Sequence, residues 1–207
     1  MSEFDLYEEY YYDDPDNEYT YRDSSVLRNK CNIREFEELV KQEYQLVRTK
    51  ALDLYISPIL VHSMKDVCKI HFMLFSELYE WAGNYRKVNI SKQGKAFMAM
   101  QSFATGEQYM DSLFNDYYDN AHDVEQISAK LAVILDNLNY MHPYREGNGR
   151  TQREVIRVLA LAKGYELLIN VDGEDGVYKQ YMDGTVYSDV KILDQLIRSL
   201  LEKWKSD

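Results

Sequence analysis

The sequence has few of the residues that would place the protein in a membrane, outside the cell or around a structural metal. It contains two cysteines, Cys31 and Cys68, and neither has a partner at metal-ligand spacing. This argues against a disulfide framework or a zinc site and favours reduced thiols. No stretch approaches the roughly 18 uncharged apolar residues of a membrane span, and the first residues lack the basic flank and apolar run of an export signal. We therefore expect a cytoplasmic protein with no membrane partner.

Two further classes are excluded by absence. No GxxxxGK(S/T) string occurs, so the protein is not a P-loop enzyme. The net charge is −11, and residues 1–23 alone hold nine acids and one base. The other 184 residues therefore share a net charge of about −3. Because phosphate contacts along a nucleic acid need a positive surface, we expect no direct binding of nucleic acid.

The acidic segment is also rich in tyrosine. We divide the chain into an acidic, tyrosine-rich N-terminal arm, residues 1–24, and one domain, residues 25–207, which is long enough to bury a core. The arm is expected to be loosely ordered, with its tyrosines packed on the domain. The alternative is that it mimics an acidic partner surface. The tyrosines in question are Tyr7, Tyr10, Tyr11, Tyr12, Tyr19 and Tyr21.

Apolar residues recur at helical spacing over most of the domain, so the expected fold class is all-α, a helical bundle. Asn32 with Glu35, Ser63 with Asp66, and Asp123 are expected helix starts, and Gly164 is an expected helix stop. The expected helices cover about residues 32–55, 63–83, 103–117, 123–142, 150–163 and 192–204.

One segment follows a different pattern. Between Tyr85 and Met98, Val88 and Ile90 alternate with polar neighbours, and Gln93-Gly94 is a turn signal. This pattern predicts a short β-hairpin. Taken alone, it is also compatible with an ordinary surface hairpin without a role in function.

The densest group of chemically useful residues is a run of nine that begins at His142, with Arg153 one helical turn further on. Gly147 and Gly149 lack a Cβ, so we expect both to take positive φ and to turn successive N–H groups toward a phosphate, at the positive end of the next helix. The run is His142, Pro143, Tyr144, Arg145, Glu146, Gly147, Asn148, Gly149 and Arg150.

Each polar side chain of this run suits the handling of a nucleoside triphosphate. Arg150 and Arg153 lie three apart on one helix face, so both are expected to reach the terminal phosphates. Glu146 is a hard oxygen ligand suited to Mg²⁺, and Asn148 adds a neutral donor. His142, which Pro143 should restrict to extended geometry, can act as the general base.

Plainer interpretations exist for each part. A His-Pro after an apolar helix is compatible with a helix stop, Gly-Asn-Gly with a turn, and two arginines with a solvated helix face. Their coincidence within twelve positions is what favours a site.

The string HPYREGNGRTQR resembles the signature of the Fic family, HPFx(D/E)GNGRxxR, with Tyr144 where the family usually has phenylalanine. The resemblance extends over about residues 19–200. It implies the Fic fold, a helical bundle whose β-hairpin, the flap, covers the active site. In that flap Lys92 and Gln93 are the expected nucleotide contacts, and a target hydroxyl would be presented along the hairpin edge by main-chain pairing.

The resemblance also implies the reaction. We expect attack by a target Tyr, Thr or Ser hydroxyl on the α-phosphorus of ATP, with His142 as base and Mg²⁺ held by Glu146. Gly149 separates the chain from the Doc branch, which has lysine there and transfers the terminal phosphate. The alternatives are transfer of another group, such as UMP or phosphocholine, and a non-catalytic module that senses nucleotide.

A regulatory feature of the family is missing. Inhibition in Fic proteins uses a motif (S/T)xxxE(G/N), whose glutamate pairs with the second signature arginine, and this sequence lacks it. The opening segment resembles that of bacterial toxin-type members. We therefore expect a small antitoxin that supplies a glutamate to Arg153, and, for this branch, DNA gyrase and topoisomerase IV subunits as targets.

The remaining histidines and tyrosines have plain interpretations. His71 faces an apolar stripe and is expected to be a satisfied core residue, while His62 and His122 flank helix starts. Tyr178 and Tyr181 are candidates to stack near the adenine, although core packing is the simpler expectation.

Overall fold

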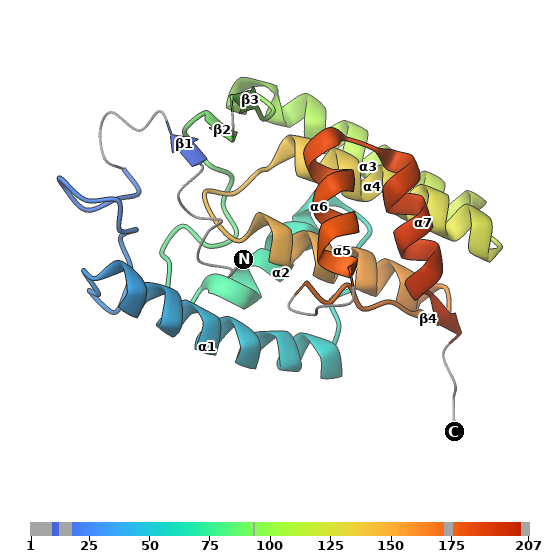
Figure 1. Cartoon of the computed structure of the whole chain (residues 1–207), viewed down its shortest axis with the longest axis horizontal. Helices are drawn as coiled ribbons and strands as arrows, with labels where there is room; N and C mark the ends of the chain where they lie inside the picture. The colour runs from blue at the N-terminus through green and yellow to red at the C-terminus, as the bar shows by residue number, and fades with distance from the viewer. Residues whose placement is uncertain (1–9, 13–17, 93, 172–175, 204–207) are drawn as a thin grey trace.

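The computed structural model describes residues 10–12, 18–92, 94–171 and 176–203. Helices dominate these residues, as Figure 1 shows, and the all-α expectation is confirmed. The helix α4 packs against α3, α5 and α7, and α2 packs against α1 and α5. The helices are α1 (Phe36–Ile56), α2 (Met64–Phe75), α3 (Phe103–Asn120), α4 (Val124–Met141), α5 (Asn148–Ala162), α6 (Val177–Tyr187) and α7 (Val190–Leu200).

Local signals set several helix ends. Ser63 and Asp66 form the expected capping box of α2, and the Asp123 carboxylate accepts from the Gln126 N–H at the start of α4, at 2.8 Å. The expected cap of α1 is wrong, because Asn32 takes a left-handed conformation (φ 55°) and the helix begins at Phe36 without a side-chain cap. The second helix also ends earlier than expected, at Phe75, and hydrogen-bonded turns replace it up to Gly83.

The core is made by the apolar faces that these helices turn inward. Leu131, Leu135 and Leu138 of α4 are buried against Val155 and Leu159 of α5 and the helices around them. Burying one such side chain contributes about 1.5–3 kcal/mol. The α4 and α5 pair therefore forms a rigid support for the short loop, residues 142–147, that joins the two helices.

The expected hairpin is confirmed as β2 (Ile90–Lys92) and β3 (Lys95–Ala96), with Gly94 at φ 77° in the turn. A strand from the N-terminal arm, β1 (Tyr10–Tyr12), adds to it antiparallel, and the order is β1-β2-β3. Tyr10 is opposite Lys92 and Tyr12 is opposite Ile90. Figure 1 shows β1 beside β2 at the end of the molecule away from β4.

Some elements were not expected. The helix α6 and the two-stranded pairing of β4 (Tyr165–Glu166) with β5 (Glu202–Lys203) lack a strong periodic signal. The last helix ends at Leu200, and the expected position of Trp204 lies outside the described residues. Tyr19, assigned to the arm, is 3% exposed and its ring meets the Trp81 ring edge-on at 5.8 Å. The packed part of the chain therefore starts before residue 25.

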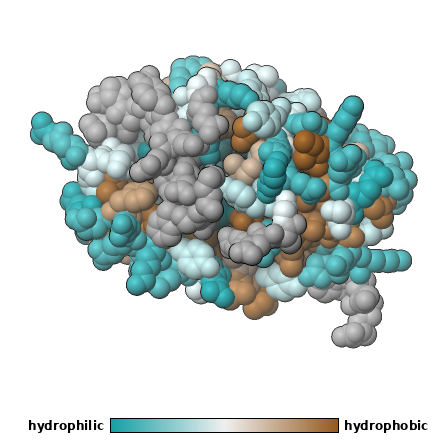
Figure 2. All heavy atoms as spheres, viewed as in Figure 1, coloured by the Kyte–Doolittle hydropathy of each residue, from teal (hydrophilic) through white to brown (hydrophobic). Residues whose placement is uncertain are grey.

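The surface of the described residues is mixed. On the face drawn in Figure 2, hydrophobic side chains reach the surface only in small groups among hydrophilic ones. Within the described residues, none of the helices combines the length and the apolar character needed to cross a membrane.

Candidate active site

His142 caps the C-terminal end of α4 and takes a left-handed conformation, with φ 43° and ψ 60°. The expectation that Pro143 would make it extended is therefore wrong. The chain changes direction here to enter the loop, and two hydrogen bonds stabilise this turn. The His142 N–H donates to the Leu138 carbonyl at 3.0 Å, and the His142 carbonyl accepts from Arg86 Nε at 2.8 Å. The imidazole stacks on the Phe97 ring, with centroids 3.9 Å apart.

The protonation state of His142 follows from its surroundings. Nδ1 lies 3.2 Å from the Asn139 carbonyl oxygen, which can only accept, so we infer that Nδ1 carries the proton and that Nε2 carries the lone pair. Burial is the main cause that lowers the pKa of His142 to about 3, and the charges of Arg86 and Lys92 lower it further. The ring is therefore neutral at neutral pH, as a general base must be.

The loop after His142 is closed by its own side chains. The Asn148 amide accepts from the Tyr144 N–H at 2.9 Å and donates to the Tyr144 carbonyl at 2.8 Å. The Thr151 hydroxyl donates to the Gly147 carbonyl at 2.9 Å. The expected role of Asn148 as an open side-chain donor is thus corrected, because its amide shapes the loop. What it offers a ligand is its main-chain N–H in the first turn of α5.

The two glycines differ. Gly147 has φ 80°, and a Cβ there would lie 2.3 Å from Phe75 Cζ, so both the backbone conformation and the close approach of α2 require glycine. Gly149 lies inside the first turn of α5 and lacks positive φ, which corrects the expectation for this residue. The anion-binding geometry is therefore one left-handed residue followed by a helix N-terminus, whose N–H groups point outward together.

Glu146 sits beside this N-terminus. Its Oε1 accepts from the Gly147 N–H at 2.8 Å and lies 3.4 Å from an Arg150 guanidinium nitrogen. Burial raises the pKa of Glu146, and the nearby charge of Glu43 adds to the rise. Within the described residues, Glu146 Oε2 has no hydrogen-bond partner, so this oxygen is the one placed to meet a cation.

Arg150 has a partner that the sequence did not reveal. Its guanidinium lies 2.5 Å from Oε1 of Glu43, a residue of α1 that is 2% exposed, and Tyr79 donates its hydroxyl to Oε2 of Glu43. The same guanidinium lies 4.8 Å from the centre of the Phe75 ring. Arg150 is therefore held from the α1 and α2 side. No local signal in the sequence identifies Glu43, because it lies 107 positions from Arg150.

Arg153 lies on the other side of α5. Its guanidinium carbon is 5.6 Å from the centre of the Tyr181 ring of α6, and the structure gives it no ion pair within the described residues. A Cβ on Gly149 would lie 3.4 Å from the Arg153 guanidinium, which places this arginine next to the first turn of α5. The prediction that Arg150 and Arg153 both meet terminal phosphates stays a prediction, and in this structure their guanidiniums contact different neighbours.

The hairpin is fastened to the His142 loop by Arg86, a second residue whose role the sequence did not reveal. This arginine is 2% exposed and donates to the carbonyls of His142, Val88 and Met98 at 2.5–2.8 Å, while its own N–H donates to the Pro143 carbonyl at 2.7 Å. Burial lowers its pKa to about 10, so it stays charged. Arg86 therefore fixes the height of the hairpin above the imidazole.

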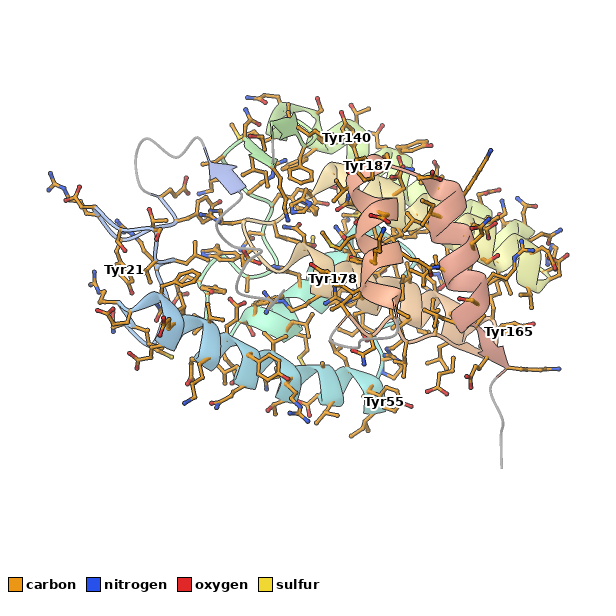
Figure 3. All side chains as sticks on the ribbon, viewed as in Figure 1. Tyr21, Tyr55, Tyr140, Tyr165, Tyr178 and Tyr187 are labelled. Carbon is orange, nitrogen blue, oxygen red and sulfur yellow. The ribbon has the colours of Figure 1, made fainter. Side chains whose placement is uncertain are left out.

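The predicted hairpin contacts have different outcomes. Lys92 ends β2, and its charge acts on His142, so the structure brings it to the site. Gln93 lies outside the described residues. On the far side, Lys95 donates to the Val186 carbonyl at 3.1 Å and its Nζ lies 4.9 Å from the Tyr187 ring centre, so the end of α6 meets the hairpin. Figure 3 marks Tyr187 and Tyr178 along this helix.

His71 is the satisfied core residue that was expected. Its Nδ1 accepts from the Gly83 N–H at 2.8 Å, and Nε2 lies 3.0 Å from the Glu146 carbonyl, to which it donates. Burial is the main cause that lowers its pKa to about 3. The Tyr144 ring stacks on it at 3.7 Å, and the Tyr144 hydroxyl donates to Cys68 Sγ at 3.5 Å. His62 and His122 are exposed, and each lies just before a helix, as expected.

Comparison with known proteins agrees with this geometry. Residues 62–160 match the model of the Fic/DOC family. A probable protein adenylyltransferase Fic of Salmonella typhimurium is 30% identical over 153 residues, covering 72% of this chain and 74% of that protein. The protein adenylyltransferase VbhT of Bartonella schoenbuchensis is 31% identical over 160 residues, which cover 75% of this chain and 33% of VbhT.

Solved structures agree on the fold. The BepC protein of Bartonella tribocorum, a VirB-translocated effector crystallised with bound AMPPNP, superposes with a TM-score of 0.79 at 19% identity, covering 90% of this chain and 97% of that chain. The type IV secretion system effector BepA gives a TM-score of 0.75 at 23% identity. The signature residues 142–153 cover the loop after α4 and the start of α5, and the hairpin stacks on His142 through Phe97. The chain belongs to the Fic/DOC family.

Proposed function

We propose that the protein is an adenylyltransferase that moves the AMP group of ATP to a tyrosine, threonine or serine hydroxyl of another protein. The observation that carries this proposal is the neutral imidazole of His142, oriented by Asn139 and placed beside the N-terminus of α5. A base and an anion-binding helix end side by side are what a hydroxyl and a triphosphate need to react. Relatives named protein adenylyltransferase support the choice of AMP as the group transferred.

The chain's own residues divide the work. His142 Nε2 takes the proton of the attacking hydroxyl as its oxygen bonds to the α-phosphorus, and pyrophosphate leaves. The main-chain N–H groups of the first turn of α5 and the Arg153 guanidinium stabilise the phosphate charge. Arg150 adds positive charge next to these groups, and its ion pairs with Glu43 and Glu146 fix its position. Phosphoryl-type transfer needs little more than such positioning and electrostatics.

Magnesium fits the site only as a partner of the nucleotide. The described residues hold no group of three or more side chains that would bind a metal ion by themselves. Glu146 supplies one carboxylate. This is consistent with the usual coordination of Mg²⁺ in nucleotide sites, by one or two carboxylates together with substrate phosphates. Bound there, the ion would neutralise phosphate charge as pyrophosphate forms.

The inhibitor belongs to the same proposal. We infer that a small antitoxin supplies a glutamate to Arg153, because the sequence lacks the inhibitory motif and Arg153 has no ion pair within the described residues. The resemblance to toxin-type members makes subunits of DNA gyrase and topoisomerase IV the first targets to try. A pull-down from the native host is expected to recover one small partner, and Arg153→Ala is expected to release it. Recovery of no such partner would count against this part.

The test of the activity compares labelled proteins. A cell lysate is incubated with α-labelled ATP, Mg²⁺ and the protein, and labelled bands are identified by mass, which also separates AMP from UMP or phosphocholine. We expect His142→Ala to lower the labelling rate by about 10²- to 10⁴-fold, as loss of a general base does. His62→Ala is the matched control, since His62 is an exposed histidine stacked on Tyr118. Equal labelling by the wild type and His142→Ala would overturn the proposal.

A further inference from the structure

One buried hydroxyl beside the first turn of α5 has no hydrogen-bond partner among the described residues. It belongs to Tyr181 of α6, which is 5% exposed, and its oxygen is still accessible to solvent. Buried tyrosines normally pair their hydroxyl, because an unpaired polar group loses its hydration without compensation. Packing in the core therefore explains the ring of Tyr181 but not its hydroxyl.

The Tyr181 hydroxyl and the Arg153 guanidinium approach the same point on α5. A Cβ on Gly149 would lie 3.7 Å from the hydroxyl oxygen and 3.4 Å from Arg153 Nη1. The main-chain N–H groups in this first turn have no acceptor within the helix. Since Arg153 has no ion pair within the described residues, neither side chain finds a negative partner there. These donors converge on a position where the acceptor has to come from a ligand.

The helix that carries this tyrosine is fixed to the frame of the active site. The helix α6 packs against α4 and α7 (Figure 1). The Asn139 side chain donates to the Thr185 carbonyl of α6 at 2.9 Å, and the Asn139 carbonyl is the one that orients His142. A Cβ on Gly184 would lie 2.4 Å from Leu193 Cδ2, so the approach of α7 is close. The hydroxyl is therefore held in place before a ligand binds.

We propose that Tyr181 is a nucleotide-binding residue, whose hydroxyl donates a hydrogen bond to an oxygen of the β- or γ-phosphate of ATP. This inference rests on the proposed function. A phosphate oxygen is the acceptor that suits these donors, because a hydrogen bond to an ionised acceptor is about twice as strong as one between neutral groups. The positive end of α5 favours the same anion.

The position of Arg153 assigns the hydroxyl to the phosphates that leave. The α-phosphorus has to lie beside His142 for the transfer, and Arg153 is the arginine expected at the terminal phosphates. The Tyr181 ring lies 5.6 Å from the Arg153 guanidinium carbon, within the range of an attraction between a cation and an aromatic face. Tyr181 thus acts twice, since its ring steadies the arginine and its hydroxyl meets the same phosphates. The site therefore selects a nucleotide that carries a terminal phosphate.

The test measures nucleotide binding by titration calorimetry, without any transfer. The probes are α,β-methylene-ATP, whose α,β bond the reaction cannot break, and AMP, each with Mg²⁺. Tyr181→Phe keeps the ring beside Arg153 and removes only the hydroxyl. We expect this variant to bind α,β-methylene-ATP at least about tenfold more weakly and to bind AMP as the wild type does.

Two controls separate this contact from a general effect on the fold. Tyr109→Phe removes a hydroxyl from an exposed tyrosine of α3 and is expected to leave the dissociation constants of both probes unchanged. The unfolding midpoint of Tyr181→Phe without nucleotide is expected to equal that of the wild type, because no described hydrogen bond of the hydroxyl is lost.

The outcomes distinguish this inference from the proposed function. An unchanged affinity of Tyr181→Phe for α,β-methylene-ATP, while the wild type still transfers AMP, would overturn the inference and leave the function standing. An equal loss of affinity for both probes would also overturn it, since the hydroxyl would then contact the nucleoside or the α-phosphate. Failure of the wild type to bind α,β-methylene-ATP at all would overturn both.

Discussion

The two sides of the first turn of α5 are built differently. On the side of α1 and α2, Arg150 is held by the carboxylates of Glu43 and Glu146, at 2.5 Å and 3.4 Å, and lies over the Phe75 ring. On the side of α6, Arg153 lies 5.6 Å from the Tyr181 ring and has no ion pair within the described residues. Two arginines three positions apart on one helix therefore serve different surroundings.

This difference separates the part of the site whose arginine already has an ion pair from the part whose arginine has none within the described residues. On the closed side, the Arg150 charge is already paired with the carboxylates of Glu43 and Glu146 before any ligand arrives. The open side offers an arginine whose electrostatic partner has to come from a phosphate or from an inhibitor. Preorganised charges stabilise a transition state without reorganisation, whereas an uncompensated one provides affinity and control. The following experiments probe this contrast, from the largest expected effect to the smallest.

Arg153→Ala tests the open side. We expect kcat/KM for AMP transfer to fall by about 10- to 100-fold, since a hydrogen bond to a charged group contributes about 1.5–3 kcal/mol. The initial rate of labelling at low ATP measures it. The unfolding midpoint is expected to stay close to that of the wild type, because no described ion pair is lost. A variant that labels at the wild-type rate would show that the two sides do not differ in this way.

Glu43→Ala tests the closed side. Its removal leaves the Arg150 charge partly buried beside Glu146 alone, and breaking a buried pair costs about 3–5 kcal/mol, to be reduced here because the Arg150 side chain is 19% exposed. Urea unfolding measures the loss. Glu43→Gln, which keeps an acceptor for Arg150 and for Tyr79, is the control and is expected to lose less. Equal stability of the wild type and both variants would contradict the idea that the ion pair of Glu43 with Arg150 stabilises the closed side.

The pH dependence of stability follows from the two buried histidines. The pKa values of His142 and His71 are lowered to about 3, whereas an unfolded histidine titrates near 6.5. Between these values the unfolded chain binds protons that the folded chain does not. Stability is therefore complete above about pH 6.5 and falls as the pH drops toward 3.

The unfolding midpoint measured from pH 7 to pH 4.5 checks this expectation. His142→Ala removes one of the two groups, so its midpoint is expected to fall less steeply than that of the wild type. Identical slopes for the two proteins would mean that His142 is not buried as a neutral imidazole.

Tyr144→Phe is expected to have the smallest effect. The ring keeps its stacking on His71, and only a bond from the hydroxyl to the weak acceptor Cys68 Sγ is lost. We expect a change in the free energy of unfolding below about 1 kcal/mol and no change in the transfer rate. Thermal unfolding and the labelling assay measure both. A large loss of activity would assign this hydroxyl a role in the chemistry rather than in packing behind the closed side.

Local patterns were enough for much of the fold. Ser63 with Asp66 and Asp123 predicted helix starts that the structure confirms, because a cap acts within a few residues of the chain. The spacing of apolar residues predicted the helices that enclose the loop. The pairing of β4 with β5 was not predicted, because the two strands are short and lie far apart in sequence. The helix α6 was not predicted either, because its apolar residues give only a weak periodic pattern and it is packed against α7 and α4.

The sequence by itself determined the chemistry of the signature and its place between two helices, since these depend on residues within twelve positions. Only the tertiary structure decided which groups surround it. Glu43 meets Arg150 across 107 positions. Arg86 donates to the carbonyls of His142 and Pro143, and His142 is held in a left-handed conformation that a residue before proline does not prefer. The pairing of β1 with β2 joins residues 78 to 82 positions apart, from Tyr12 with Ile90 to Tyr10 with Lys92. Such contacts form because burial brings distant polar groups together and requires them to find partners, which no local pattern of residues records.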